Sequence, residues 1–323
     1  MARLIGANNN EDIALLTNRK YYNKSLKHWN NSLGFSPDDL SNLHVWYKVH
    51  ELSLSHNDLV SSLTDSSGNA LHALQDGADS LKPQFKSTTN TLNGYESIYF
   101  NGSSNILTAD ISGNVLNNRQ ATVFVIYQAA GTIGQTSGYL ITSRVNTSNT
   151  YGNRTWMLQA RHPGVGTFNH ISSPGMGFAV GNGSFSNTKS AYVPSELGSS
   201  YSWSSSPSDS AALPFPEVMI LGACCVDGSV NYDEYDVSVN GLAGNIGTAY
   251  VVNYDRDFEE LSVGKAHGLS WGNFRGYLHE VIIYSDNKIG ADHDKVVGYL
   301  AHKYGVRSIL YKNHEYKLGP PNG

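Results

Sequence analysis

The sequence predicts an all-β fold, a two-sheet antiparallel jelly-roll sandwich with one short packing helix near its end. From about residue 43, short apolar runs rich in β-branched and aromatic residues alternate with polar turns that contain Gly and Asn. Strands at this density, without helices between them, are typical of sandwiches and jelly rolls. Only residues 292–304 show apolar residues at helical spacing.

Composition excludes several classes of partner. The chain has 323 residues, of which 15% are charged, and its formal net charge is −5. A strongly basic surface is therefore not expected, and nucleic acid is not a predicted partner. No apolar run reaches the roughly 20 residues of a membrane helix, and the N-terminal residues lack the apolar core of a signal peptide. We expect neither a membrane partner nor export.

Residues 1–42 are interpreted as an N-terminal arm rather than a domain, because they are Asn-rich with few apolar residues. Ser36 and Pro37 suit the N-cap and first position of one helical turn. We expect the arm to dock on neighbouring subunits through backbone hydrogen bonds and a few apolar anchors. The candidate interface residues are Ile13, Leu15, Leu16, Tyr21 and Tyr22.

The predicted jelly roll spans residues 43–307, and a polar tail follows at 308–323. Its strands are expected, in order, at 43–49, 96–102, 121–129, 138–144, 155–161, 217–228, 235–244, 259–265 and 276–285. Asn240-Gly241 is a strong signal for a tight hairpin turn. Cys224 and Cys225 are adjacent, so in a strand they point to opposite faces and no disulfide between them is expected.

A Ser-rich stretch at about 181–215 interrupts the strands, and it contains Trp203. Unstructured stretches of this length are uncommon inside a domain. Two interpretations remain equally open, a mobile insertion and a contact loop for another subunit or a ligand.

The predicted helix carries acidic residues in its first turn, Asp292 and Asp294, where the helix dipole favours anions. We expect Gly298 to allow close approach to the sheet and Gly305 to follow the helix as a left-handed cap. Its apolar stripe would pack on the β-domain and consists of Val296, Val297, Leu300, Ala301 and Tyr304.

The end of this region resembles the C-terminal signature of laminin-G-like jelly-roll domains, within the concanavalin A-like lectin/glucanase fold found in phage and bacterial surface and virion proteins. The residues that carry the resemblance are Phe274, Gly276, Leu278, Glu280, Val281, Ile282, Ile283 and Tyr284, followed by "YLAHKYG" at 299–305. The opening strand "LHVWYKV" and the turn with Asp65, Ser67, Gly68 and Asn69 resemble the start of the same domains. Lys48-Val49-His50 stands where such domains often have Asp-Ala-Ser.

The signature residues have physical interpretations as well. Asp65 and Asn69 suit a turn held by bonds from side chain to backbone, and Gly68 supplies a positive φ. We expect Glu280 to be a paired structural carboxylate. His302 is expected to be a surface or packing residue.

The resemblance raises the question of glycan hydrolysis, because retaining glucanases of this fold carry E-x-D-x-E or E-x-D-x-x-E on one strand. This chain offers Glu234 and Asp236 on one strand face, but Ser238 and Val239 occupy the positions of the third carboxylate. The acid/base is therefore missing. We predict no catalytic residues and no enzyme.

Metal and cofactor sites are not predicted either. The histidines show no ligand spacing. Calcium, which related domains sometimes bind, could only be assigned to Asp110 and Asp227, without further support.

A sugar site would need exposed aromatic rings and hydrogen-bonding side chains. Trp203 and Trp271 are the candidate ligand-binding residues, whereas Trp156 suits the core.

The first functional hypothesis is a non-enzymatic virion structural protein of a tailed phage, a capsid decoration, neck or tail-appendage component. It would be made in the host cytoplasm, and its partners would be other virion proteins or further copies of itself. The alternative is a lectin-like module that recognises a surface glycan. A glycan hydrolase is the least favoured hypothesis.

Overall fold

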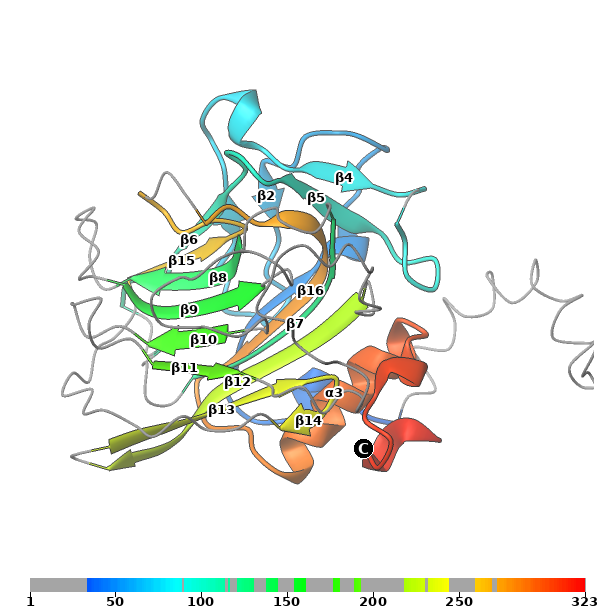
Figure 1. The fold of residues 1–323 in the computed structure, drawn as a ribbon. Helices are drawn as coiled ribbons and strands as arrows, with labels where there is room; N and C mark the ends of the chain where they lie inside the picture. The colour runs from blue at the N-terminus through cyan, green and yellow to red at the C-terminus, as the bar shows by residue number, and fades with distance from the viewer. Residues whose placement is uncertain are drawn as a thin grey trace, which may run out of the picture.

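The computed structural model describes residues 34–88, 90–113, 116, 121–130, 138–144, 154–160, 177–180, 189–192, 218–229, 232–243, 259–268 and 272–322. Two antiparallel sheets face each other, and a helix, α3 (Ala291–Lys303), lies against the first of them (Figure 1). The predicted all-β, two-sheet sandwich with one packing helix is confirmed. In the described part of the chain, no helix is long and apolar enough to cross a membrane.

The first sheet has the strand order β14-β13-β12-β7-β16-β5-β4, and β1 pairs with β16 beside β5. Its strands are β1 (Leu43–Lys48), β4 (Gln84–Lys86), β5 (Ser97–Asn101), β7 (Thr122–Ala129), β12 (Val218–Ser229), β13 (Tyr232–Val239), β14 (Leu242–Ala243) and β16 (Arg275–Tyr284).

The second sheet has the order β11-β10-β9-β8-β15-β6-β3-β2. Its strands are β2 (Ser62–Leu63), β3 (Ala73–Leu74), β6 (Leu107–Asp110), β8 (Gly138–Arg144), β9 (Arg154–Ala160), β10 (Gly177–Val180), β11 (Lys189–Tyr192) and β15 (Glu260–Val263).

The main core fills the space between the two sheets. Alternate residues of each strand point into it, as the two-residue period of a strand requires. Val123, Val125 and Tyr127 enter from β7, and Leu261 and Val263 enter from β15. The opposite faces of the two sheets are therefore free to carry other side chains.

A second core lies between the first sheet and α3. Phe124 and Ile126 of β7 and Ile282 and Tyr284 of β16 meet the helix there. The predicted stripe packs in this core, since all of its members are buried: Val296, Val297, Leu300, Ala301 and Tyr304.

The helix ends in the way the sequence predicts. Gly305 has a φ of 67°, Val306 N–H donates to Ala301 O at 2.8 Å, and Gly305 N–H donates to His302 O at 3.1 Å. These two bonds form a Schellman cap. The expected role of Gly298 was wrong in one respect. A Cβ at this position would lie 2.7 Å from the Tyr316 side chain, so Gly298 makes room for the C-terminal segment rather than for the sheet.

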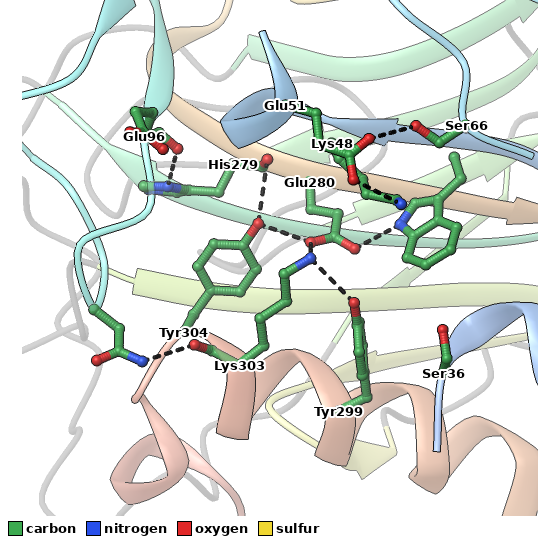
Figure 2. Close-up of polar contacts among 12 residues, drawn as sticks. Ser36, Lys48, Glu51, Ser66, Glu96, His279, Glu280, Tyr299, Lys303 and Tyr304 are labelled. Carbon is green, nitrogen blue, oxygen red and sulfur yellow. Dashed lines mark hydrogen bonds and ion pairs between the residues drawn. The ribbon is translucent and has the colours of Figure 1, made fainter. Parts of the chain in front are cut away.

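A buried ion pair joins the helix to β16 (Figure 2). Lys303 Nζ donates to Glu280 Oε2 at 2.6 Å, and their side chains are 1% and 0% exposed. Trp46 Nε1–H donates to Oε1 at 2.6 Å, and the Tyr304 hydroxyl donates to Oε2 at 2.7 Å. Lys303 also donates to the Tyr299 hydroxyl at 3.0 Å. Glu280 is thus a fully paired structural carboxylate, as expected.

A β-bulge in β16 places Glu280 on the helix side. The pairing with β7 shifts register between Leu278 and Glu280, so Leu278 points into the main core while Glu280 points away from it. The extra residue, His279, is fully buried and contacts Glu96 O and Gln128 Oε1, each at 3.2 Å. Burial lowers the pKa of His279 to about 3.

Two local signals in the sequence fold as predicted. Asn240 and Gly241 both have positive φ and form the two-residue turn between β13 and β14. The Asp65 carboxylate accepts the backbone N–H groups of Trp46, Ser67 and Leu71 at 2.9–3.0 Å, which makes it the centre of the expected turn.

Short 3-10 helices complete the fold: η2 (Pro37–Asp39), η3 (Val49–Glu51), η4 (Asp79–Leu81), η7 (Arg307–Ile309) and η8 (Glu315–Lys317). Ser36 is the N-cap of η2 and Pro37 its first residue, as predicted. Phe35 and Leu310, which flank the predicted jelly roll, are both buried in the second core. His302 Nε2 donates to Tyr316 O at 2.7 Å, so His302 holds the C-terminal segment. The domain boundaries at 42/43 and 307/308 stay predictions.

Candidate functional site

A cleft of about 720 Å³ lies on the outer face of the second sheet. It crosses β3, β6, β15 and β8, of which β6, β15 and β8 are seen side by side in Figure 1. Its lining residues are Ala70, His72, Leu74, Gln75, Asp76, Gly77, Thr108, Asp110, Ser112, Arg144, Glu259 and Glu260. The volume suits a small organic ligand.

Strand alternation explains why this face is polar. In "LTAD" of β6 and "ELSV" of β15, the apolar residues enter the main core. The residues between them, Thr108 and Asp110 in β6 and Glu260 in β15, therefore face outward. The cleft is the polar side of strands whose apolar side builds the core.

Three charged residues form a row across the floor of the cleft. Glu260 is the cross-strand partner of Asp110 on one side and of Arg144 on the other. Such direct partners have Cβ atoms about 5 Å apart. The row brings together residues that are up to 150 positions apart in the sequence, so only the sheet pairing creates it.

Of the three residues in this row, Glu260 is the one in contact with the other charged groups, Arg144 and His267. The Arg144 guanidinium pairs with Oε2, His267 Nδ1 contacts Oε1 at 2.9 Å, and the Ser262 hydroxyl donates to Oε1 at 3.1 Å. Burial alone would raise the pKa of Glu260. The hydrogen bonds and charges of His267 and Arg144 outweigh burial and hold that pKa below its ordinary value. Glu260 therefore carries its negative charge at neutral pH.

Asp110 is exposed, and it also stays ionised. The side-chain hydroxyl and the backbone N–H of Ser112 donate to Oδ1 at 2.6 and 2.9 Å. These two bonds lower the pKa of Asp110. Both reach the same oxygen, so Oδ2 can accept a hydrogen bond from a ligand.

The wall formed by residues 70–77 adds a donor and an apolar surface. The backbone N–H of Asp65 donates to His72 Nδ1 at 3.0 Å, so the proton of the neutral ring lies on Nε2. Leu74 is 42% exposed and lies opposite Thr108. Gln75 holds the wall in place, because it donates to Ile106 O at 3.0 Å and accepts from Gly77 N–H at 2.9 Å.

The chemistry of the cleft suits binding better than proton transfer. A general acid needs a carboxyl group whose pKa is raised, but Asp110 and Glu260 both have lowered pKa values. The described residues contain no group of three His, Cys, Asp or Glu side chains that could hold a metal ion. The cleft floor offers the carboxylate acceptors Asp110 and Glu260 beside the hydroxyl of Thr108, and groups of these kinds can bond the hydroxyls of a ligand.

The residues expected to bind a ligand or to form an interface all lie outside the described part of the chain. They are Trp203, Trp271, Ile13, Leu15, Leu16, Tyr21 and Tyr22. Trp156 lies on β9, where its backbone is opposite Ser143 of β8, and its side chain is not among the described ones. These predictions stay predictions.

Two residues considered for calcium have different positions. Asp110 lines the cleft, where its carboxylate binds Ser112. Asp227 lies on β12 of the first sheet, opposite Glu234. The structure places them on different sheets.

Sequence reasoning missed most of the cleft. His72, Arg144 and Glu260 were not singled out as site residues. The alternation of polar and apolar residues in β6 and β15 could have indicated a polar outer face. Nothing local in the sequence shows that these two strands are neighbours, or that Arg144 lies beside them.

No protein-family model matches this sequence, and no curated protein matches it. Solved structures show a distant likeness. One is the CBM40 module of the Ruminococcus gnavus IT-sialidase bound to α2,3-sialyllactose, which is 14% identical with a TM-score of 0.40, over 61% of this chain and 92% of the module.

Two further solved structures are similar to the same degree. Domain 4 of AbnA, a GH43 arabinanase from Geobacillus stearothermophilus, in complex with arabinotriose, is 14% identical with a TM-score of 0.42, over 76% of this chain and 93% of that domain. Trypanosoma rangeli sialidase in complex with sialic acid is 12% identical with a TM-score of 0.47, over 86% of this chain and 38% of the sialidase. At TM-scores below 0.5, these likenesses assign neither a family nor a function to this chain.

Proposed function

We propose that this chain is a carbohydrate-binding protein, and that the cleft on the second sheet is its binding site. The observation that carries the proposal is the polar row of Asp110, Glu260 and Arg144 on the floor of a cleft of ligand size. Sugar hydroxyls both donate and accept hydrogen bonds. The carboxylates of this row can accept them, and the hydroxyl of Thr108 in the same lining can donate or accept.

The remaining lining supports a sugar over other ligands. Among the described lining residues, Ala70 and Leu74 are the only two with apolar side chains, too few for a lipid or another largely apolar ligand. Leu74 can pack against the C–H face of a sugar ring. An extended peptide would add to a free strand edge, whereas this cleft lies on the face of four paired strands.

We further propose that the chain binds its glycan without hydrolysing it. Asp110 and Glu260 are close enough to resemble the carboxyl pair of a retaining glycosidase. Their lowered pKa values leave both ionised at neutral pH, so neither can protonate a leaving group. Binding of oligosaccharides without release of reducing sugar is the expected result.

The test is a glycan array followed by calorimetry on the full chain and on two variants that carry the same substitution. Thr108→Arg fills the cleft, because Thr108 lies between Leu74 and Ser262 on its floor. Thr88→Arg is the control, since Thr88 is exposed and lies outside the cleft. We expect the first variant to lose binding and the second to keep it. Equal binding by both variants would place any glycan elsewhere on the molecule.

The hypothesis of a phage virion component remains a prediction, as does the finer resemblance to laminin-G-like domains. The hypothesis rested on the absence of an export signal and of a catalytic set, on the arm at residues 1–42 and on the Ser-rich stretch at about 181–215. Residues 1–33 and 193–217 lie outside the described part of the chain. Carbohydrate binding is compatible with it, because a virion surface protein can also bind a glycan.

A further inference from the structure

We infer that the cleft selects glycans that carry protonated amines, such as hexosamines without an N-acetyl group, over neutral glycans, and neutral over anionic ones. This inference rests on the proposed function and names the class of sugar that the site would take. It follows from the balance of charges along the cleft.

Carboxylates dominate the lining. The described lining residues include four carboxylates, Asp76, Asp110, Glu259 and Glu260, against one Arg or Lys side chain, Arg144. That cation is already committed, because the Arg144 guanidinium pairs with Glu260. The Arg144 side chain is also only 8% exposed, so little of it faces a ligand.

Three carboxylates remain for the ligand. Asp76, Asp110 and Glu259 are all exposed, and they lie on three different segments of the lining, before β6, at its end and at the start of β15. A ligand in the cleft is therefore close to negative charge on more than one side. An ammonium group can form charge-assisted hydrogen bonds with these oxygens.

An anionic sugar would meet the opposite situation. A uronate or sialate carboxylate would replace water beside carboxylates that are already ionised, which costs free energy even at exposed sites. The guanidinium of Arg144 could not compensate, since Glu260 holds it. The acetyl group of an N-acetylated sugar removes the charge that the cleft attracts, so such sugars should behave as neutral ones.

The test uses oligosaccharides that share a backbone and differ in the groups at C2 and C6, which set their charge. Hexasaccharides of glucose, N-acetylglucosamine, glucosamine and glucuronate form one series, and the corresponding galactose compounds form a second. Dissociation constants are measured by calorimetry at low and at high salt. We expect the free-amine member to bind roughly tenfold more tightly than its neutral counterpart at low salt, and the advantage to shrink at high salt.

Matched charge-removing variants locate the effect. Asp110→Asn and Glu259→Gln should bring the affinity ratio between amine and neutral sugar toward one, while neutral sugars still bind. Glu315→Gln removes an equally exposed carboxylate on η8, and it should leave the ratio unchanged. Raising the pH until the amine loses its proton should abolish the preference.

Each outcome decides between the two proposals. If no sugar of either series binds, the proposed function fails, and the selectivity falls with it. If neutral or uronate sugars bind at least as tightly as the amine, the selectivity is overturned but carbohydrate binding stands. A preference that survives in the Asp110 and Glu259 variants, or equally tight binding of oligolysine, would show a response to general surface charge and would also overturn it.

Discussion

The two sheets carry the same kind of ion pair on their outer faces, but among the described residues only the face of the first sheet is covered by a helix. On the first sheet, Glu280 pairs with Lys303 beneath α3, and both side chains are at most 1% exposed. On the second sheet, Glu260 pairs with Arg144 at the floor of a cleft, with side chains 15% and 8% exposed. Coverage decides what each pair can do. The first pair lies entirely beneath the helix and fixes its position, whereas the second leaves a carboxylate at the floor of a cleft that a ligand can enter.

The largest expected effect on stability comes from replacing the covered carboxylate, Glu280. Glu280→Gln leaves Lys303 buried without its counter-charge. Because glutamine keeps only one acceptor oxygen, either the indole of Trp46 or the hydroxyl of Tyr304 also loses its acceptor. We expect the free energy of unfolding in urea to fall by about 3–5 kcal/mol. The double variant with Lys303→Met should recover part of this loss. A double variant that is no more stable than Glu280→Gln would show that the buried charge is not the cause.

The buried His279, next to Glu280 in β16, should make folding stability depend on pH. Its pKa is about 3 in the folded chain and 6.5 in the unfolded chain, so between these values only the unfolded chain binds the proton. Folding stability must therefore fall as the pH falls, by at most about 1.4 kcal/mol per pH unit from this residue. His279→Gln should flatten the pH profile of stability between pH 6.5 and 3. His56→Gln, the same change at a half-buried histidine outside both cores, is the control. A profile with the same slope in both variants would contradict the assignment.

The open pair should matter less for stability. Glu260→Gln should lower the free energy of unfolding at neutral pH by about 1–3 kcal/mol. The loss is smaller than for Glu280 because the pair of Arg144 and Glu260 is more exposed to water. The pKa of Glu260 is lowered by folding, so its contribution is present above the ordinary value of 4.5 and disappears as the pH falls through the folded value. Parallel pH profiles of the variant and the parent chain down to strong acid would argue against this pair.

The smallest effect on stability is expected at the apolar wall of the cleft. Leu74 is 42% exposed, so Leu74→Ser should change the free energy of unfolding by less than about 0.5 kcal/mol. The same change should weaken glycan binding, because it removes the surface that packs on a sugar ring. Unchanged affinity in calorimetry would place the sugar away from this wall.

The sequence predicts the covered side of the molecule far better than the open side. The helix stripe, the cap at Gly305 and the Asn240-Gly241 turn depend on neighbours within a few positions, and short-range patterns reveal them. The row of Asp110, Glu260 and Arg144 depends on which strands pair over long sequence distances. That pairing follows from the packing of the whole sandwich, so no short-range sequence pattern predicts it.

The place of β16 in the first sheet has a consequence for how the protein is made. It is the last strand in the sequence, yet it lies in the sheet interior, with β7 along one edge and β5 and β1 sharing the other. During synthesis, β1, β5 and β7 emerge from the ribosome long before the strand that joins them. Their apolar faces and open edges stay exposed until residues 275–284 arrive. We therefore expect the nascent chain to need protection from aggregation, and truncation before β16 to abolish folding rather than shorten the domain.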